Sequence, residues 1–257
     1  MLQAGITLKS PREIEYMRQA GRVVAQVIHV LTRAIHPGVR TGELDALAER
    51  EMRGLGAVAS FKGYRGYPAI ICVSINEEIV HGIPGKRILK EGDIVSLDVG
   101  AIVNGYQGDA AVTVGVGRTS PQAQRLIETT RNALEAGIQA AKAGNRIGDI
   151  SWAVQRCAEA QGFSVVREYV GHGIGRALHE EPAVPNYGEP GKGIALETGM
   201  VLALEPMVNV GTWRTRVKPD NWTVVTLDGS LSAHFEHTVA ITDGAPEALT
   251  RWDGVDG

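Results

Sequence analysis

The spacing of hydrophobic positions predicts two amphipathic helices followed by strands, and this order occurs twice along the chain. Residues 10–56 and 120–162 each hold a helix with apolar positions three and four apart, a glycine-containing turn and a second helix. Ser10-Pro11 and Ser120-Pro121 supply an N-cap and a proline at the first helical position. The positions that recur at one offset are Gly38/Gly144, Gly42/Gly148, Gly56/Gly162 and Arg40/Arg146. The last glycine of each segment is expected in the left-handed conformation that ends a helix.

Short apolar segments rich in β-branched residues predict the strands that follow each pair of helices. They are residues 69–75, 93–99, 109–116, 200–208, 222–227 and 234–242. The doubled order favours an α+β fold with pseudo-twofold symmetry, a mixed or antiparallel sheet and helices packed on one face. No low-complexity linker separates the two halves, at about 10–119 and 120–245. We therefore expect a single domain over residues 1–257.

Composition narrows the classes of partner and the compartment. The 257 residues are 44% hydrophobic and 21% charged, with a formal net charge of −3 and no block of Lys or Arg. These features argue against nucleic acid as the main ligand, although a transient ribosome contact through a small patch stays open. Cys72 and Cys157 have no motif spacing, and no apolar segment reaches signal-peptide or membrane-spanning length. We expect a cytoplasmic monomer that has no membrane contact.

Four carboxylates interrupt strands that are otherwise apolar, where an unpaired charge is costly. They are Asp98, Asp109, Glu205 and Glu236, and the strand segments contain no Lys or Arg to pair with them. Asn104-Gly105 is a favoured two-residue hairpin turn, which would pair Val103 with Tyr106 and Asp98 with Ala111. This register sets Asp109 opposite Gly100, on the same sheet face as Asp98. Like charges so close together call for a cation.

Three histidines lie in glycine-rich or turn-like segments, where the backbone can approach a ligand closely. They are His81, His172 and His179, whereas His29, His36, His234 and His237 are interpreted as core, surface or supporting groups. One histidine with four carboxylates is an oxygen-rich ligand set, suited to two divalent ions bridged by carboxylates. Such a pair of ions can activate water and polarise a carbonyl, which points to hydrolysis of an acyl bond.

The motifs around these residues resemble those of the methionine aminopeptidases, in the same order and at comparable spacing over about residues 7–243. They are HGIPG at 81–85, DVGAIVNGYQGD at 98–109, GHGIG at 171–175, HEEP at 179–182, LALEPM at 202–207 and EHT at 236–238. The resemblance implies peptidase family M24, its pita-bread fold and, because only 33 residues separate His172 from Glu205, the bacterial single-domain type I. The implied reaction removes the initiator methionine from nascent polypeptide N-termini when the second residue is small. A hydroxide that bridges two metal ions would hydrolyse the bond.

The resemblance also implies roles for individual residues. The metal ligands would be Asp98, Asp109, His172, Glu205 and Glu236, with Asp109 and Glu236 bridging. Glu205 would also act as the general base, His81 would contact the scissile amide or help proton transfer, and His179 would stabilise the oxyanion. The methionine pocket, beside His81 and His179, would be lined by Phe61, Tyr64, Tyr67, Cys72, Leu178 and Trp222. A monovalent Na or K ion would lie near Asn76, Glu78 and Ser232.

Three positions depart from the family pattern and change the expected shape of the pocket. Leu178 and Phe61 stand where Phe and Cys are common, and Arg65 stands where His is common. Co, Mn, Fe and Zn are all compatible with the ligand set, so the native metal stays open. Two alternatives also stay open, a prolidase or proline-specific aminopeptidase of the same fold and a non-catalytic binding protein that shares it.

Overall fold

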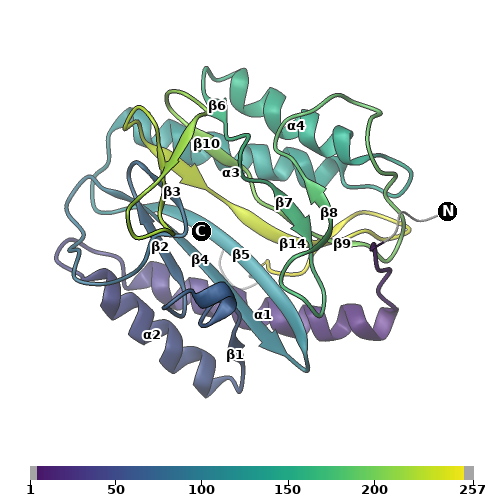
Figure 1. The fold of residues 1–257 in the computed structure, drawn as a ribbon, viewed down its shortest axis with the longest axis horizontal. Coiled ribbons are helices and arrows are strands. Elements are labelled where there is room, and N and C mark those ends of the chain that lie inside the picture. Colours follow the sequence, from purple (N-terminus) through teal and green to yellow (C-terminus); the bar gives the residue numbers. More distant parts are fainter. Residues whose placement is uncertain (1–4, 252–257) are drawn as a thin grey trace.

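A computed structural model describes residues 5–251 as two helical hairpins that pack against strands (Figure 1). The helices of these residues are α1 (Pro11–Arg33), α2 (Thr41–Gly54), α3 (Pro121–Ala140) and α4 (Ile147–Glu159), with a short 3₁₀ turn η1 (Tyr64–Gly66). In the view of Figure 1, α1 and α2 lie toward the bottom and α3 and α4 toward the top. Within residues 5–251, no helix combines the length and the apolar character needed to cross a bilayer.

The central sheet has nine strands, all paired antiparallel, in the order β1-β4-β5-β14-β9-β7-β8, with β2 on β4 and β15 on β14. Its strands are β1 (Val58–Ala59), β2 (Cys72–Ile75), β4 (Ile94–Val103), β5 (Tyr106–Gly115), β7 (Gly171–Gly173), β8 (Glu180–Val184), β9 (Val201–Leu204), β14 (Glu236–Ala240) and β15 (Glu247–Ala248). Two sheets of three strands flank it, in the orders β13-β10-β6 and β11-β12-β3. They contain β3 (Glu78–Val80), β6 (Ser164–Val165), β10 (Met207–Asn209), β11 (Thr215–Val217), β12 (Val224–Thr226) and β13 (Ser232–His234).

The helix ends follow the sequence signals. The Ser10 side chain accepts a hydrogen bond from the backbone of Glu13, whose carboxylate accepts one from the backbone of Ser10, completing a capping box at the start of α1. Ser120 caps α3 through its own hydroxyl. Gly56 and Gly162, which follow α2 and α4, have φ values of 68° and 79°. The predicted left-handed positions are therefore confirmed.

Residues at the repeated offset occupy matching places in the two helical hairpins. Arg40 precedes α2 and forms an isolated antiparallel bridge with Ile88, and Arg146 precedes α4 and forms one with Ala195. Glycine is required at the first turn of α4, because a Cβ atom at Gly148 would lie 2.2 Å from a backbone oxygen. The internal repeat of the sequence thus corresponds to a repeated pattern of contacts between a helix start and the chain that passes beside it.

The helices cover the sheet face opposite to the one that carries the carboxylates. Leu97 and Val99 flank Asp98 on β4, are 0% exposed and pack in one cluster with α1 and α2. Leu202 of β9 packs with Leu134 of α3 in the corresponding cluster of the other half. Each such buried side chain stabilises the fold by roughly 1.5–3 kcal/mol. This packing leaves Asp98 and its neighbours on the opposite face of the sheet.

Candidate metal centre and active site

The β4–β5 hairpin sets the first two carboxylates on one face of the sheet. Asn104 and Gly105 form its turn with φ values of 52° and 77°, as a type I′ turn requires. Asp98 pairs with Ala111 and Asp109 pairs with Gly100. The register predicted from the Asn-Gly turn is therefore confirmed, and both carboxylates project from the side of the sheet that the helices leave uncovered.

The other two carboxylates lie where the chain passes from one sheet to another. The predicted strand 200–208 is divided, because β9 ends at Leu204 and β10 begins after Pro206, which cannot donate a backbone hydrogen bond. The predicted strand 234–242 is divided in the same way between β13 and β14. His237 pairs with Leu204 at the end of β9, and a carboxylate oxygen of Glu205 lies within 4.8 Å of one of Glu236. Two breaks in the strands thus bring two glutamates together.

His172 reaches the carboxylates from β7, next to β9. Side chains larger than glycine are excluded on both sides of it, because a Cβ atom at Gly171 or Gly173 would lie 2.3 or 2.2 Å from a backbone oxygen. His172 Nδ1 lies 2.8 Å from the carbonyl oxygen of Gly173, to which a neutral imidazole donates its proton. Nε2 then stays free as a ligand atom and lies 3.5 Å from Oε1 of Glu205.

Several carboxylate oxygens of this cluster are buried without any hydrogen-bond partner, namely Oδ1 of Asp98, Oδ1 of Asp109 and Oε1 of Glu236. Burial raises the pKa of Asp98 to about 7. Burial also raises the pKa of Asp109, and the negative charges of Glu236 and Asp98 add to the rise. The pKa values of Glu205 and Glu236 are raised in the same way, by burial first and by neighbouring carboxylates second. Such a cluster is stable with all its charges only when cations neutralise it.

The donor atoms are close enough to share metal ions. One ligand atom each from Asp109, His172 and Glu236 lies within 4.8 Å of the others, and the same holds for Glu205, His234 and Glu236. Because Glu236 belongs to both groups, the two can hold neighbouring ions with a shared carboxylate. The unpartnered oxygens and the oxygen-rich donor set therefore fit two divalent ions.

Two further histidines stand beside this cluster. The ring of His179 lies 4.1 Å from that of His172 between centroids, and its Nδ1 lies 2.9 Å from the hydroxyl oxygen of Tyr64. His81, in the turn after β3, has a positive φ of 60° and meets the ring of Trp222 edge-on. Burial lowers the pKa of His81 to about 4, and partial burial together with Arg65 lowers that of His179. Both rings are therefore neutral near pH 7.

One pocket brings together the predicted ligands, histidines and substrate-binding residues. It is lined by Phe61, Tyr64, Arg65, Tyr67, Cys72, His81, Asp98, Asp109, His172, Leu178, His179, Glu205, Trp222 and Glu236. Asp98, Asp109, Glu236 and His172 come from strands of the central sheet, and Glu205 directly follows β9. Most of the apolar and aromatic side chains come from the loops around the sheet. The structure thus gathers these residues in one place, and their individual roles stay predictions.

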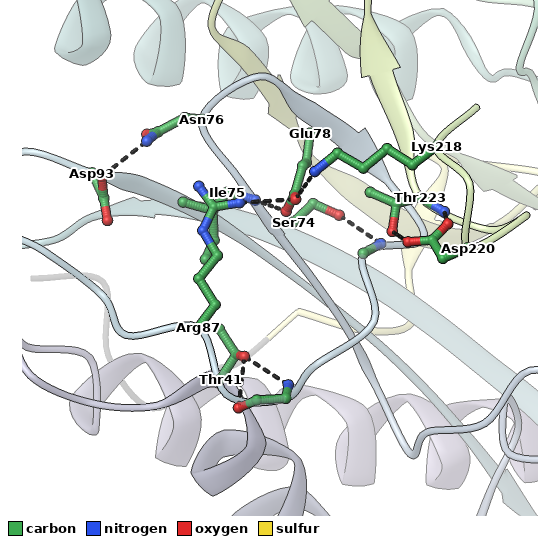
Figure 2. Close-up of polar contacts among 12 residues, drawn as sticks. Thr41, Ser74, Ile75, Asn76, Glu78, Arg87, Asp93, Lys218, Asp220 and Thr223 are labelled. Atoms are coloured by element: carbon green, nitrogen blue, oxygen red, sulfur yellow. Dashed lines mark hydrogen bonds and ion pairs between the residues drawn. The ribbon is translucent and has the colours of Figure 1, made fainter. Parts of the chain in front are cut away.

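The buried carboxylate of Glu78 joins two loops by binding Arg87 and Lys218, and Figure 2 shows it between these two cationic side chains. Oε1 of Glu78 accepts hydrogen bonds from Nη1 of Arg87 at 2.8 Å and from Nζ of Lys218 at 2.6 Å. Arg87 follows the turn that begins with His81, and Lys218 stands shortly before Trp222. The Glu78 side chain is only 9% exposed, so both ion pairs are shielded on one side from water.

The residues predicted to surround a monovalent cation lie close together near β3. The backbone N–H of Ser232 donates to the carbonyl oxygen of Asn76 at 2.9 Å, and Asn76 itself has a positive φ of 60°. The Asn76 side chain donates to Asp93, as Figure 2 shows. Oε1 of Glu78 binds its two cationic partners, and Oε2 accepts a hydrogen bond from the backbone N–H of Ile75 at 2.8 Å, which leaves backbone oxygens as donors for an ion. The monovalent-cation site stays a prediction.

Residues 15–243 match the model of metallopeptidase family M24. The chain belongs to this family. The M24 chain is 55% identical over 246 residues to the methionine aminopeptidase of Clostridium acetobutylicum, covering 95% of this chain and 98% of that protein. It also resembles the crystal structure of methionine aminopeptidase from Thermotoga maritima, with a TM-score of 0.95, 50% identity and coverage of 96% of this chain and 100% of that one.

A more distant likeness of the M24 chain shows the fold alone. The prolidase from Pyrococcus furiosus is 23% identical, with a TM-score of 0.77 and coverage of 96% of this chain and 66% of that one. The pita-bread fold and the family that the motifs implied are therefore both confirmed.

Two residues of the site are not among the predicted ligands, catalytic groups or pocket-lining residues. Arg65, which the sequence marks only as a departure from the family pattern, lines the pocket with its guanidinium over the ring of Tyr64. The sequence places His234 with His29, His36 and His237 as a core, surface or supporting residue, whereas the structure sets it against Glu205 and Glu236. A histidine two residues before a glutamate in a strand points to the same face as that glutamate, which is the only sequence signal that could have singled it out.

Proposed function

We propose that this chain is a metal-dependent aminopeptidase that removes an N-terminal methionine when the second residue of the polypeptide is small. The observation that carries the proposal is the cluster of buried, unpartnered carboxylates with His172 in a pocket of mainly apolar and aromatic side chains. The relatives named methionine aminopeptidase, which match over nearly the whole chain, support the same activity.

Five side chains would hold the two divalent ions: Asp98, Asp109, His172, Glu205 and Glu236. Bound there, the ions would lower the pKa of a water molecule and polarise the carbonyl of the first residue. At its carboxylate, Glu205 would accept the proton that the attacking water loses and pass it on to the leaving amine. Glu205 is thus proposed as the general base as well as a ligand.

The two neutral histidines would act on the peptide itself. If the Tyr64 hydroxyl donates to Nδ1 of His179, then the imidazole proton lies on Nε2 and can be donated to the carbonyl oxygen as negative charge develops there. His81 would contact the scissile amide, with its ring held by edge contacts with Trp222 and Tyr169. Because both rings are neutral near pH 7, each offers one N–H donor without competing for the metal carboxylates.

Selectivity for methionine would come from the apolar wall of the pocket. Phe61, Tyr67, Cys72 and Leu178 are buried and pack in one cluster, with Trp222 against it. Burial raises the pKa of the Cys72 thiol, so it stays neutral and presents a polarizable sulfur. Thioether side chains make favourable contacts with aromatic rings and sulfur, which suits this wall to methionine.

The surroundings of the reaction belong to the same proposal. The reaction would take place in the cytoplasm on the N-termini of nascent polypeptides. The enzyme would be a monomer that contacts the ribosome transiently. The two pseudo-symmetric halves would form one catalytic domain. The divalent ions would be Co, Mn, Fe or Zn, and a Na or K ion would bind near Asn76, Glu78 and Ser232.

The test measures free methionine released from Met-Ala-Ser and Met-Leu-Ser by chelator-stripped protein after separate addition of Mn(II), Co(II), Fe(II) or Zn(II). We expect metal-dependent cleavage of Met-Ala-Ser and little of Met-Leu-Ser. Glu205→Gln should lose turnover, whereas Glu197→Gln, a matched change at an exposed position just before β9, should retain it. Cleavage of an Ala-Pro peptide instead would favour the prolidase alternative, and silence with every metal would favour a binding protein.

A further inference from the structure

His234, the last residue of β13, is buried against the metal centre without a partner for its ring nitrogen Nε2. The residue is 2% exposed, and Nε2 has no hydrogen bond. An unsatisfied polar atom of this kind costs roughly 1–3 kcal/mol, so a core position would be better filled by an apolar side chain. Residues 5–251 provide no partner for this nitrogen, so the ring needs a ligand from outside the described part of the chain.

The two nearest charged atoms are carboxylate oxygens of the proposed metal ligands. Nε2 of His234 lies 3.7 Å from Oε2 of Glu236 and 3.9 Å from Oε2 of Glu205. Both distances exceed the ~3.2 Å limit of an ordinary N–H···O hydrogen bond. Atoms that bind one ion at about 2.1 Å lie roughly 3.0–3.4 Å apart. A movement of about half an ångström would therefore let one ion contact all three side chains.

Glu205 stands between two imidazoles, each facing a different oxygen. Its Oε1 faces Nε2 of His172 at 3.5 Å, and its Oε2 faces Nε2 of His234 at 3.9 Å. The two histidines thus hold comparable positions relative to the same carboxylate. Only His172 is assigned as a ligand by the motifs of the family.

The backbone holds His234 firmly in this position. Its N–H donates to Oγ1 of Thr113 at 2.9 Å, and the same hydroxyl donates to its carbonyl oxygen at 2.8 Å. Met207 pairs with His234 on the neighbouring strand β10. Because the backbone of His234 is held on both sides, its side chain keeps a fixed direction and reaches the carboxylates without rearrangement of the backbone.

We propose that His234 is a sixth protein donor to the metal centre and binds, through Nε2, the ion that Glu205 and Glu236 share. This inference rests on the proposed function only in requiring that a divalent ion occupies the site. It assigns a ligand role to a residue that is outside the five-ligand set of the motifs.

The test uses cobalt(II)-loaded protein and needs no peptide substrate. A histidine bound through Nε2 keeps its Nδ1 proton, which gives a strongly shifted, exchangeable NMR resonance next to a paramagnetic ion. We expect two such resonances in the wild-type protein, from His172 and His234, and one in His234→Gln. Chelator competition should show at least about tenfold weaker binding of one cobalt ion in His234→Gln.

His237→Gln is the matched control, because His237 lies in the adjoining strand, points to the opposite sheet face and has its Nδ1 2.8 Å from Oγ1 of Thr250. It should keep both resonances and the wild-type affinity. A single resonance in the wild type, or wild-type cobalt affinity in His234→Gln, would overturn the inference. If His234→Gln does not fold, the wild-type spectrum alone decides. Failure of the wild type to bind any cobalt would instead refute the proposed function as well.

Discussion

Replacing Asp98 by asparagine is expected to stabilise the metal-free protein, although it removes a proposed metal ligand. Burial raises the pKa of Asp98 to about 7 in the folded state, whereas an unfolded aspartate titrates near 3.9. Between these values the unfolded chain has released the proton and the folded chain still holds it. Folding therefore takes up protons in this window, so the free energy of unfolding falls as pH rises from about 4 to about 7.

The size of the effect follows from the two pKa values. The difference between the folded and unfolded pKa values of Asp98 lowers the free energy of unfolding by about 4 kcal/mol at neutral pH, at 1.36 kcal/mol for each pKa unit. Asparagine has nearly the same shape as aspartate and no charge to desolvate. In a chain of this length, 1 kcal/mol shifts the midpoint of thermal unfolding by about 2–4 °C. We expect Asp98→Asn to raise that midpoint by roughly 8–16 °C at pH 7.5 in a chelator, and by little at pH 4.5.

The assay is thermal unfolding of wild type and variant from pH 4.5 to 7.5, with EDTA and then with excess Mn(II). Metal should reverse the order, because each of the two ions at 100 Kd adds about 2.7 kcal/mol to the wild type. Together they exceed the advantage of about 4 kcal/mol that the variant has without metal, and the variant binds them more weakly. Asp93→Asn is the control, because Asp93 accepts hydrogen bonds from the Asn76 side chain and from the backbone of Lys90. Its replacement should lower the unfolding midpoint across the pH series. A metal-free wild type whose stability rises between pH 5 and 7, with no gain from Asp98→Asn, would refute the reasoning.

Two further predictions concern the supports of the site. Glu78→Gln leaves Arg87 and Lys218 without their shared charge, so the loops that carry His81 and Trp222 should loosen. We expect kcat/KM to fall roughly tenfold, about 1.4 kcal/mol, with cobalt affinity unchanged, and an equal loss of metal would contradict this. Gly148→Ala sets a Cβ atom 2.2 Å from a backbone oxygen and should lower the unfolding midpoint by several degrees, whereas Gly54→Ala meets no atom within 4 Å and should not.

The elements that the sequence predicted best are those governed by local chemistry. Serine followed by proline marks the starts of α1 and α3 because the hydroxyl and the fixed proline φ act within one turn. Asn104-Gly105 fixed the hairpin register in the same way, since both residues adopt positive φ at little cost. With that register known, the shared face of Asp98 and Asp109 followed from the two-residue period of strands.

The elements that could not be predicted depend on contacts between distant segments. The strand β7 reads Gly-His-Gly, which has no strand propensity of its own. It forms because glycine alone fits between the backbones of β8 and β9, a fact visible only when the strands are assembled. The division of residues 200–208 and 234–242 between two sheets likewise depends on the pairing of β10 with β6 and β13, although Pro206 is a local signal for the first break.

These unpredicted breaks are also what makes the site. A continuous strand would hold Glu205 within the central sheet, but the change of sheet after Leu204 and again at Phe235 brings β13 and its His234 close to Glu236, the first residue of β14. Burial raises the pKa of Glu236 there and the neighbouring carboxylates raise it further, and the packing of Leu97 and its neighbours against the helices must offset that cost without metal. A bound ion removes the cost itself. The same geometry that makes the metal-free protein sensitive to pH therefore gives the site its affinity for metal.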